Sequence, residues 1–413
     1  MREPLVTIVT PSYNQGEFIR ATIESVLRQD YPAIEYIIVD GGSTDRTAAV
    51  VAEYAGRLRW ISENDRGQSH AINKGFRLAR GEIVAWLNSD DTLLDGAVSS
   101  AVRAFVANPR AGAVYGEGYL MDRQGSVTGR FPHTEPLNLW KLVHLSDYIL
   151  QQSVFFRKEI VDELGGLDED LHYTMDWDLL IRIGKRRPLH YIPEYLGCLR
   201  EYPEAKSFSG GPRRIREIAG LLRRHTGMWL PPGLVIYGLE TYRQLWCRRI
   251  EGLTPRALRR VSAVLQWLIR VGCGYLIERA IWTAQGWYPD GWASPRVRCM
   301  LPPGEGPLVI EGSLPETNTD LRGQVIRVWS GGVTIAEAAV PAGEFRLSVG
   351  WPAGSTTGPV EFELRAARSF RPSAPEPARY GRRLAYVLRS VGWGRPEDAI
   401  TPGKTSPHPP ASS

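Results

Sequence analysis

The first 225 or so residues alternate short apolar runs with segments in which apolar residues recur at the helical spacing. The apolar runs are short and rich in β-branched residues, so they predict β-strands: LVTIVT (5–10), EYIIVD (35–40), LRWISE (58–63), EIVAWLN (82–88) and AGAVYGEGYL (111–120). The first four lack polar alternation, which predicts burial on both faces. Segments with the helical period lie between the runs, at residues 16–29, 45–56, 69–81 and 94–109. Strand and helix in repetition predict an α/β fold, with a largely parallel sheet and helices on both of its faces.

Beyond this region the pattern changes twice. Residues 226–294 form a predicted helical connector, in which arginines gather on one side of the pattern and Trp, Leu and Ile on the other. Residues 295–395 return to short alternating runs separated by Gly and Pro, which is typical of an antiparallel β-sandwich; examples are PLVIEGSL, QVIRVWS, GVTIAEAAV, EFRLSVGW and PVEFELRA. The last segment, 396–413, is rich in Pro and Ser and is expected to be disordered. We therefore predict four parts, the first of them residues 1–225.

Two of these parts allow more than one role. The connector either packs on neighbouring elements, which we favour, or rests its basic amphipathic surface on anionic lipid as a peripheral membrane contact. The sandwich aromatics Trp329, Trp351 and Phe370 either fill its core, which we favour, or stack on sugars.

Composition changes this picture little. The chain has 413 residues, with 50 Lys and Arg against 45 Asp and Glu, and the net charge of +5 is too small to indicate a nucleic-acid-binding protein. The four cysteines, Cys198, Cys247, Cys273 and Cys299, are far apart, which disfavours a zinc site or a disulfide framework and favours a reducing, cytoplasmic location. The first residues do not resemble a signal peptide, and no uninterrupted apolar run reaches the roughly 18 residues of a membrane-spanning helix.

Candidate chemistry lies where the predicted parallel strands end. In open α/β sheets, ligands bind beyond the carboxyl ends of the strands, and the segments at these ends are PSYNQG, DGGSTD, ENDRG and NSDD. Helix capping would explain one acidic end, but aspartates at three of them together favour a binding site. The adjacent Asp90 and Asp91 repel each other, so a metal ion or exposure to water is expected to offset their charge.

Several of these segments, in this order, resemble a known family. The stretch VTIVTPSYNQGEFIRATIESVLRQDYPAIEYIIVDGGSTDRT, followed by SENDRGQSHAINKGFRLARGEIVAWLNSDD, is similar to the catalytic domain of inverting family 2 glycosyltransferases, which has the GT-A fold. The resemblance covers roughly residues 5–210. It implies a glycosyltransferase that moves a sugar from a nucleotide-diphosphate donor, with a UDP-sugar as the first candidate, to a glycan or lipid-linked saccharide in cell-surface polysaccharide biosynthesis.

The same resemblance assigns a nucleotide pocket. Its contacts fall on the end of the first strand, on the aspartate after the second and on the ENDRG segment: Pro11, Ser12, Tyr13, Asp40, Asp65 and Arg66. The NSDD segment becomes the metal and ribose motif, carried by Asp90 and Asp91. Mg²⁺ or Mn²⁺ agrees with this assignment, because hard dications prefer carboxylate oxygens and act as Lewis acids for a departing diphosphate.

A later acidic segment supplies the predicted catalytic base. GGLDEDLHYTMDWDLLIRIGKR, residues 165–186, is similar to the family motif in which a carboxylate at the start of a helix faces the acceptor. This makes Asp176 the base and Asp178 a supporting or structural residue, and the alternative for Asp176 is an N-cap of the helix. Two residues depart from the family: Met175 stands where an acidic residue commonly precedes the base, and Tyr202 where many relatives carry a histidine near the metal.

Other polar residues of this region carry less information. QQSVFFRKE resembles the family strand on the acceptor side, so Gln151, Gln152 and Ser153 are candidate acceptor contacts, although a polar start to a buried strand explains them equally well. His172 and His190 are interpreted as structural. The two departures leave open a nucleotide-sugar or carbohydrate-binding protein without turnover. A sugar-phosphate nucleotidyltransferase is disfavoured, because no Gly-rich basic loop lies near the start of the chain.

Overall fold

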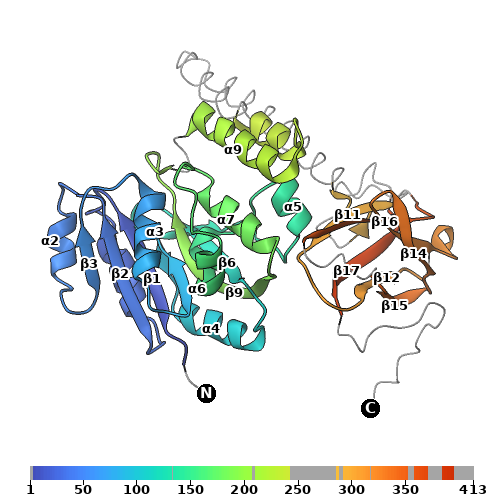
Figure 1. Cartoon of the computed structure of the whole chain (residues 1–413), viewed down its shortest axis with the longest axis horizontal. Helices are drawn as coiled ribbons and strands as arrows, with labels where there is room; N and C mark the ends of the chain where they lie inside the picture. Colours follow the sequence, from blue (N-terminus) through green and yellow to red (C-terminus); the bar gives the residue numbers. More distant parts are fainter. Residues whose placement is uncertain are drawn as a thin grey trace. The chain divides into compact units, whose positions relative to one another are not determined.

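The computed structural model describes residues 3–132, 134–206, 210–241, 285–287, 292–316, 318–351, 358–370 and 384–394. The chain divides into two compact units, Met1–Leu253 and Thr254–Ser413, which Figure 1 traces in colour. Residues 242–284 of the predicted connector, with Cys247 and Cys273, lie outside the described residues, as does the predicted disordered tail.

The first unit is built on a nine-stranded sheet, and its N-terminal half is parallel. The strands β3 (Arg59–Ser62), β2 (Ile34–Asp40), β1 (Val6–Ser12) and β4 (Ile83–Trp86) lie side by side in that order. β1, β4 and most of β2 are buried, as their uninterrupted apolar runs predict. The predicted burial is wrong for β3, in which Trp60 is 38% exposed. This strand is the edge of the sheet, so a neighbouring strand covers only one of its sides.

The other half of the sheet is mixed. β8 (Val154–Arg157) runs antiparallel between β4 and β6 (Ala113–Met121), and β9 (Leu189–Arg200) pairs parallel with β6. Two short strands complete the sheet, β5 (Thr92–Leu93) beside β9 and β7 (Val127–Arg130) beside β6. The predicted largely parallel arrangement is therefore confirmed for β1 to β4, whereas β8 reverses the direction beyond them.

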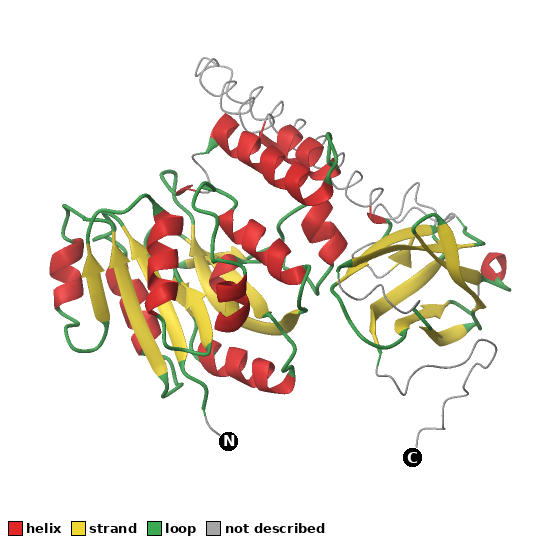
Figure 2. Ribbon diagram, viewed as in Figure 1, coloured by secondary structure: helices red, strands yellow, loops and turns green. Residues whose placement is uncertain are grey.

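Helices occupy the segments that carry the helical period. α1 (Ile19–Leu27), α2 (Thr47–Ala52), α3 (Gln68–Leu78) and α4 (Ala97–Ala107) fall within the four predicted segments to within a residue. α3 packs on β1 and β2, and α4 on β6 and β9 (Figure 2). The approach of α3 is close, because a Cβ added to Gly75 would stand 2.3 Å from a methyl carbon of Val9.

Four further helices follow in the same unit: α5 (Leu139–His144), α6 (Lys158–Glu163), α7 (Met175–Gly184) and α9 (Gly211–Thr226). Both α7 and α9 pack on α5, so a helix that follows β9 packs against the helix that follows β7. Residues 232–241 are also helical, so the start of the predicted connector belongs to this unit. Within the described parts of the chain, we find no helix with the length and apolar character needed to span a membrane.

The second unit is an antiparallel β-sandwich. Its strands are β10 (Trp292–Ala293), β11 (Arg296–Leu301), β12 (Leu308–Leu314), β13 (Val325–Ser330), β14 (Val333–Ala339), β15 (Gly343–Val349), β16 (Val360–Ala366) and β17 (Tyr386–Trp393). One sheet has the order β10-β17-β12-β15 and the other β11-β16-β13-β14. Apolar residues of both sheets, including Ile310 and Phe362, share one core. The predicted fold class, α/β followed by an antiparallel sandwich, is confirmed.

The aromatic residues of the sandwich contribute to its packing. Trp351 and Phe370 pack against the core, as favoured from the sequence. Trp329 carries the guanidinium of Arg365 at 3.7 Å from its ring centre. Sugar stacking is therefore not needed to explain these side chains.

Candidate active site

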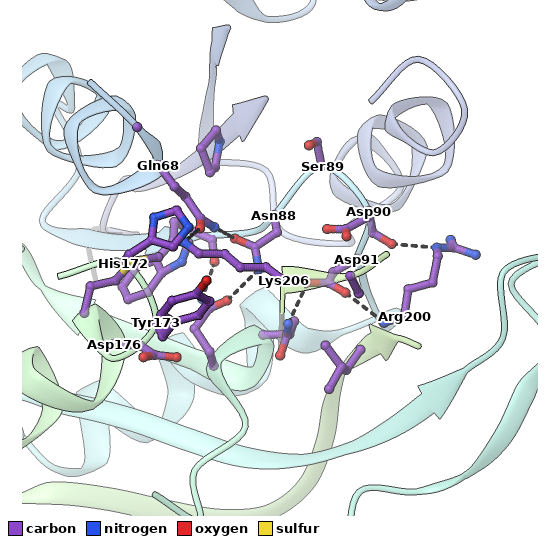
Figure 3. Close-up of a pocket in the computed structure, with 18 of the residues that line it drawn as sticks. Gln68, Asn88, Ser89, Asp90, Asp91, His172, Tyr173, Asp176, Arg200 and Lys206 are labelled. Carbon is purple, nitrogen blue, oxygen red and sulfur yellow. Dashed lines mark hydrogen bonds between the residues drawn. The ribbon is translucent and has the colours of Figure 1, made fainter. Parts of the chain in front are cut away.

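A cavity of about 1060 Å³ opens at the carboxyl ends of the parallel strands of the first unit. It is lined by seven of the predicted site residues: Pro11, Ser12, Tyr13, Asp65, Asp90, Asp91 and Asp176. Figure 3 shows part of this lining, with Asp90 and Asp91 on one side and Asp176 on the other. The sequence thus identified both the place of the cavity and most of its acidic groups.

Strand register explains why distant segments meet here. Ser12 lies opposite Asp40 in the pairing of β1 with β2, and Asp40 lies opposite Ser62 in the pairing of β2 with β3. The three strands therefore end at one level. Asn14 then takes a left-handed backbone conformation with φ of 53°, and its Oδ1 accepts a hydrogen bond from Thr44 N at 2.9 Å. This bond ties the loop after β1 to the loop after β2.

Asp40 and Arg66 are not among the residues that line the cavity. Asp40 is 1% exposed and accepts hydrogen bonds from Ser43 N at 3.0 Å, from Ser43 Oγ and from Ser62 Oγ at 2.6 Å. These bonds fix the loop in which Gly41 and Gly42 face the cavity. The side chain of Arg66 is 72% exposed and pairs with Glu169 at 2.5 Å.

Asp91 is enclosed by protein donors. Its Oδ1 accepts a hydrogen bond from Arg200 N at 2.9 Å, and its Oδ2 accepts bonds from Asn88 Nδ2 at 3.0 Å and Gln152 Nε2 at 2.6 Å. Burial, and then the negative charge of Asp90, raise the pKa of Asp91 to about 8. Both oxygens of Asp91 therefore have protein partners. Through them Asp91 anchors the acidic turn, residues 88–91, to β9 and to the segment before β8.

Asp90 faces the cavity and has a different environment. Its Oδ2 accepts a hydrogen bond from Tyr202 OH at 2.7 Å, so Tyr202, at the position where the resemblance led us to expect a histidine, contacts this carboxylate directly. The Tyr202 ring is held by Phe18, at 5.0 Å between ring centres, and by the guanidinium of Arg123 at 5.6 Å. Burial raises the pKa of Asp90. Asp90 is therefore the carboxylate of the turn that a ligand can reach.

The number of possible metal ligands in the cavity lining limits how a cation could be bound there. Among the described residues, no group of three or more His, Cys, Asp and Glu side chains is arranged to hold a metal ion. Mg²⁺ commonly binds through one or two carboxylates together with substrate phosphates and water. Asp90 therefore fits a dication that is shared with a bound diphosphate, whereas the described side chains do not fit an ion held by protein alone.

Asp176 lies in the first turn of α7. The N-cap of this helix is Thr174, and Asp176 Oδ1 accepts a hydrogen bond from the adjacent Trp177 N at 2.9 Å, so Asp176 is not the N-cap. Glu217 of α9 fixes the preceding loop, because its Oε1 accepts bonds from Tyr173 N at 2.6 Å and Thr174 N at 2.8 Å. Burial raises the pKa of Asp176.

Asp178 is structural by its contacts. It is 1% exposed, and its two oxygens pair with Arg182 Nε at 2.6 Å and His225 Nε2 at 2.8 Å. The contact with Arg182 lies within α7, and the contact with His225 joins α7 to the end of α9. The sequence left its role open between support and structure, and the contacts agree with the second.

The sequence of the first unit matches a known protein family. Residues 7–163 match the family model described as Glycosyl transferase family 2. The first unit contains a family 2 glycosyltransferase domain. The match includes the acidic turn and ends before α7, so Asp176 lies beyond the matched segment of this glycosyltransferase domain.

Two similar proteins are matched by this chain over only part of their own length. The O-antigen biosynthesis protein RfbC of Myxococcus xanthus is 30% identical over 218 residues, which are 51% of this chain and 17% of RfbC. The chondroitin synthase of Escherichia coli is 30% identical over 194 residues, 46% of this chain and 28% of the synthase. The structure of the mannosyltransferase PcManGT from Pyrobaculum calidifontis, in complex with GDP-Man and Mn²⁺, aligns with a TM-score of 0.45 at 19% identity and covers 69% of this chain and 86% of that one.

The cavity also contains residues that the sequence did not indicate. Asp147 lines it, and burial together with the negative charge of Asp176 raises the pKa of Asp147 well above its usual range. Trp86 also lines it, and its buried Nε1, like Oγ of the predicted Ser12, has no hydrogen-bond partner within the described chain. A lone Asp or Trp in an apolar segment follows no pattern that would have marked it.

The remaining candidates divide between the cavity and its support. Gln151 and Gln152 line the cavity, but their amides are bound to Trp86 O at 2.8 Å and to Asp91. Ser153 lies outside it and bonds to the carbonyls of Gly116 and Leu150. His190 contacts Asn108 at 3.0 Å, whereas His172 is part of the cavity lining.

Proposed function

We propose that the family 2 glycosyltransferase domain transfers a sugar, with inversion, from a nucleoside-diphosphate donor to an acceptor hydroxyl. The observation that carries this proposal is the presence, in one cavity, of the acidic turn at Asp90 and of the partly buried Asp176. A departing diphosphate requires a counter-charge and an attacking hydroxyl requires a base, and the two acidic sites supply these needs at different places.

In the proposed reaction, Asp176 accepts the proton of the acceptor hydroxyl while the hydroxyl oxygen forms a bond to the anomeric carbon of the sugar. The bond from this carbon to the diphosphate oxygen breaks on the opposite face, and its electrons leave with the nucleoside diphosphate. The raised pKa of Asp176 supports the role of base, since it strengthens proton acceptance. When bound at Asp90, Mg²⁺ or Mn²⁺ would neutralise the diphosphate as a Lewis acid.

The nucleoside would lie against the ends of β1 and β3. Tyr13 is 62% exposed at the edge of the cavity and is free to stack on a base, and Ser12 Oγ is an unpaired polar atom beside it. Asp65 would complete this pocket, with Asp40 supporting it through the adjacent glycines and Arg66 at the rim. We take UDP-sugars as the first candidate donors.

The alternative is a binding protein without turnover, which the departures at Met175 and Tyr202 suggested. The contacts of these two residues do not favour it. Met175 is 6% exposed and its sulfur accepts a hydrogen bond from Ser69 Oγ at 3.1 Å, so this departure serves packing. Tyr202 contacts Asp90 without displacing it from the cavity. Both acidic sites of the proposed reaction remain in place.

A donor panel tests the proposal. The full chain is heated with UDP-, GDP-, ADP- and TDP-sugars, each in EDTA and in Mn²⁺, and the unfolding temperature is recorded. A donor that binds the folded state at about 100 times its Kd adds about 2.7 kcal/mol to the stability, so we expect one class of base to shift the transition, and more strongly with Mn²⁺. If no donor shifts it and none is hydrolysed or transferred, the proposed function is wrong.

The acceptor belongs to the same proposal. Two relatives are named for O-antigen biosynthesis and for chondroitin synthesis. These names support a growing glycan or a lipid-linked saccharide as acceptor, in cell-surface polysaccharide biosynthesis. We further propose a cytoplasmic protein that contacts the inner face of the membrane, in agreement with the free thiols of the described Cys198 and Cys299.

The end of α9 supports such a membrane contact. Trp229 is 78% exposed and Leu230 is 52% exposed, directly after a helix whose last turn carries Arg223 and Arg224. Apolar and aromatic residues beside arginines favour the interface of an anionic bilayer. We expect Trp229→Ala to weaken sedimentation of the full chain with phosphatidylglycerol vesicles by about tenfold, from the burial energy of one large side chain. Trp60→Ala, at an exposed site on β3, is the matched control, and equal binding by both variants would contradict the contact.

A further inference from the structure

The donor side of the cavity holds few available cations. A diphosphate would bring negative charge to a turn that already carries Asp90 and Asp91. Arg200 is 4% exposed, and its guanidinium donates hydrogen bonds to the carbonyls of Asp90, Asp122 and Arg123 at 2.7, 3.1 and 2.9 Å. Arg200 therefore holds the backbone around Asp90. Neutralising a bound diphosphate requires another positive charge, in addition to a dication bound at Asp90.

Lys206 stands at the place where such a charge would act. It follows β9 by a few residues and lines the cavity, and Figure 3 shows it together with Asn88 and Tyr173. Its Nζ donates a hydrogen bond to Gln68 Oε1 at 2.6 Å, and the ammonium lies 6.0 Å from the ring centre of Tyr173. The side chain is thus held across the cavity rather than extended into solvent.

A hydrogen-bond chain connects this ammonium group with the acidic turn. Gln68 receives the bond from Lys206 and donates through Nε2 to Asn88 Oδ1 at 2.6 Å. Asn88 then donates through Nδ2 to Asp91 Oδ2 at 3.0 Å. The ammonium is therefore oriented by the same side-chain amides that hold Asp91, in the cavity that Asp90 also lines.

Burial of the Lys206 ammonium group disfavours its charged form. Burial lowers the pKa of Lys206 to about 8, although Asp176 and Glu217 oppose the shift. A cation that is only partly compensated by protein groups gains when an anionic ligand arrives, because the ligand replaces the lost hydration. Phosphate oxygens are strong acceptors for a lysine ammonium group.

We propose that Lys206 binds the diphosphate of the donor and of the leaving nucleoside diphosphate, as a cation supplied by the protein beside the dication at Asp90. This inference rests on the proposed function. It assigns part of the charge neutralisation to the chain itself, so diphosphate binding is expected to persist when divalent ions are removed and to depend on Lys206 under those conditions.

Calorimetric titration of the full chain tests this assignment. UDP and UMP, with GDP and GMP in parallel, are titrated in EDTA and in Mn²⁺ against Lys206→Met, Lys206→Arg and, as a matched control outside the cavity, Lys158→Met. A charged hydrogen bond corresponds to about ten- to a hundredfold in affinity. We therefore expect Lys206→Met to weaken diphosphate binding in EDTA by at least tenfold, with little effect on the monophosphates, and Lys206→Arg to retain most of the affinity.

The outcomes separate this inference from the proposed function. Unchanged diphosphate binding by Lys206→Met, or an equal loss for mono- and diphosphates, overturns the role of Lys206 but not the glycosyltransferase proposal. No nucleotide binding by the unmodified chain contradicts both. Should Lys206→Met fail to fold, acetylation of Lys206 in the unmodified chain, followed by mass spectrometry, gives the answer. Protection by the diphosphate and not by the monophosphate supports the contact, and absence of protection overturns it.

Discussion

Asp176→Asn is expected to lower the rate of sugar transfer by about two to four orders of magnitude, the usual contribution of a positioned base. The amide of asparagine has nearly the shape of the carboxyl group but does not accept the hydroxyl proton. Its oxygen keeps the bond from Trp177 N, so the start of α7 should persist. Nucleotide affinity is expected to stay close to that of the unmodified chain. Release of nucleoside diphosphate in the presence of acceptor measures the first effect, and calorimetric titration the second.

The pH dependence gives this prediction a second readout. A base acts only when ionised, and burial holds the pKa of Asp176 above 3.8, the ordinary value for an aspartate. kcat/KM should therefore fall as the pH drops, with a midpoint above that value. Asp170→Asn, at an exposed site in the loop before α7, is the matched control and should keep both rate and profile. Full transfer by Asp176→Asn would remove Asp176 from the mechanism.

Asp90 and Asp91 are adjacent, but Asp90→Asn and Asp91→Asn are expected to have different effects. The first should impair Mn²⁺-dependent binding, and the second should lower the folding stability. Asn at 91 places an amide group against the donors Arg200 N, Asn88 Nδ2 and Gln152 Nε2, so at least one buried donor loses its acceptor. The expected cost is about 1–3 kcal/mol of folding free energy. Thermal unfolding of the free protein should show this loss.

Asn at 90 keeps an oxygen for Tyr202 OH and removes the negative charge that contributes to the raised pKa of Asp91. The unfolding temperature is therefore not expected to fall. What should be lost is the Mn²⁺-dependent part of nucleoside-diphosphate binding and of transfer, the latter by about a hundredfold or more if the ion supplies several kcal/mol. Full stimulation by Mn²⁺ in Asp90→Asn, or an unchanged unfolding temperature in Asp91→Asn, would contradict this division of roles.

Local pattern was sufficient for the elements and for the place of the site. Apolar runs such as that of β1 predict buried strands because they have no polar face to offer to water. Since parallel strands end at one edge of a sheet, the aspartates that follow them were expected to meet there. The same reasoning failed for β3, because an apolar run does not reveal whether its strand is central or at the edge.

The sequence by itself determined the α/β fold, the sandwich and the acidic cavity, because these follow from periodicity and from residues close together in the chain. Only the tertiary structure decided how adjacent residues divide their roles. Asp91 became an anchor through Gln152 and Arg200, which lie 61 and 109 residues away, while Asp90 stayed open to the cavity. Lys206 reached the site through Gln68, 138 residues distant. Such partners depend on how the sheet and helices assemble, since burial and hydrogen-bond geometry are properties of the folded neighbourhood and not of the local sequence.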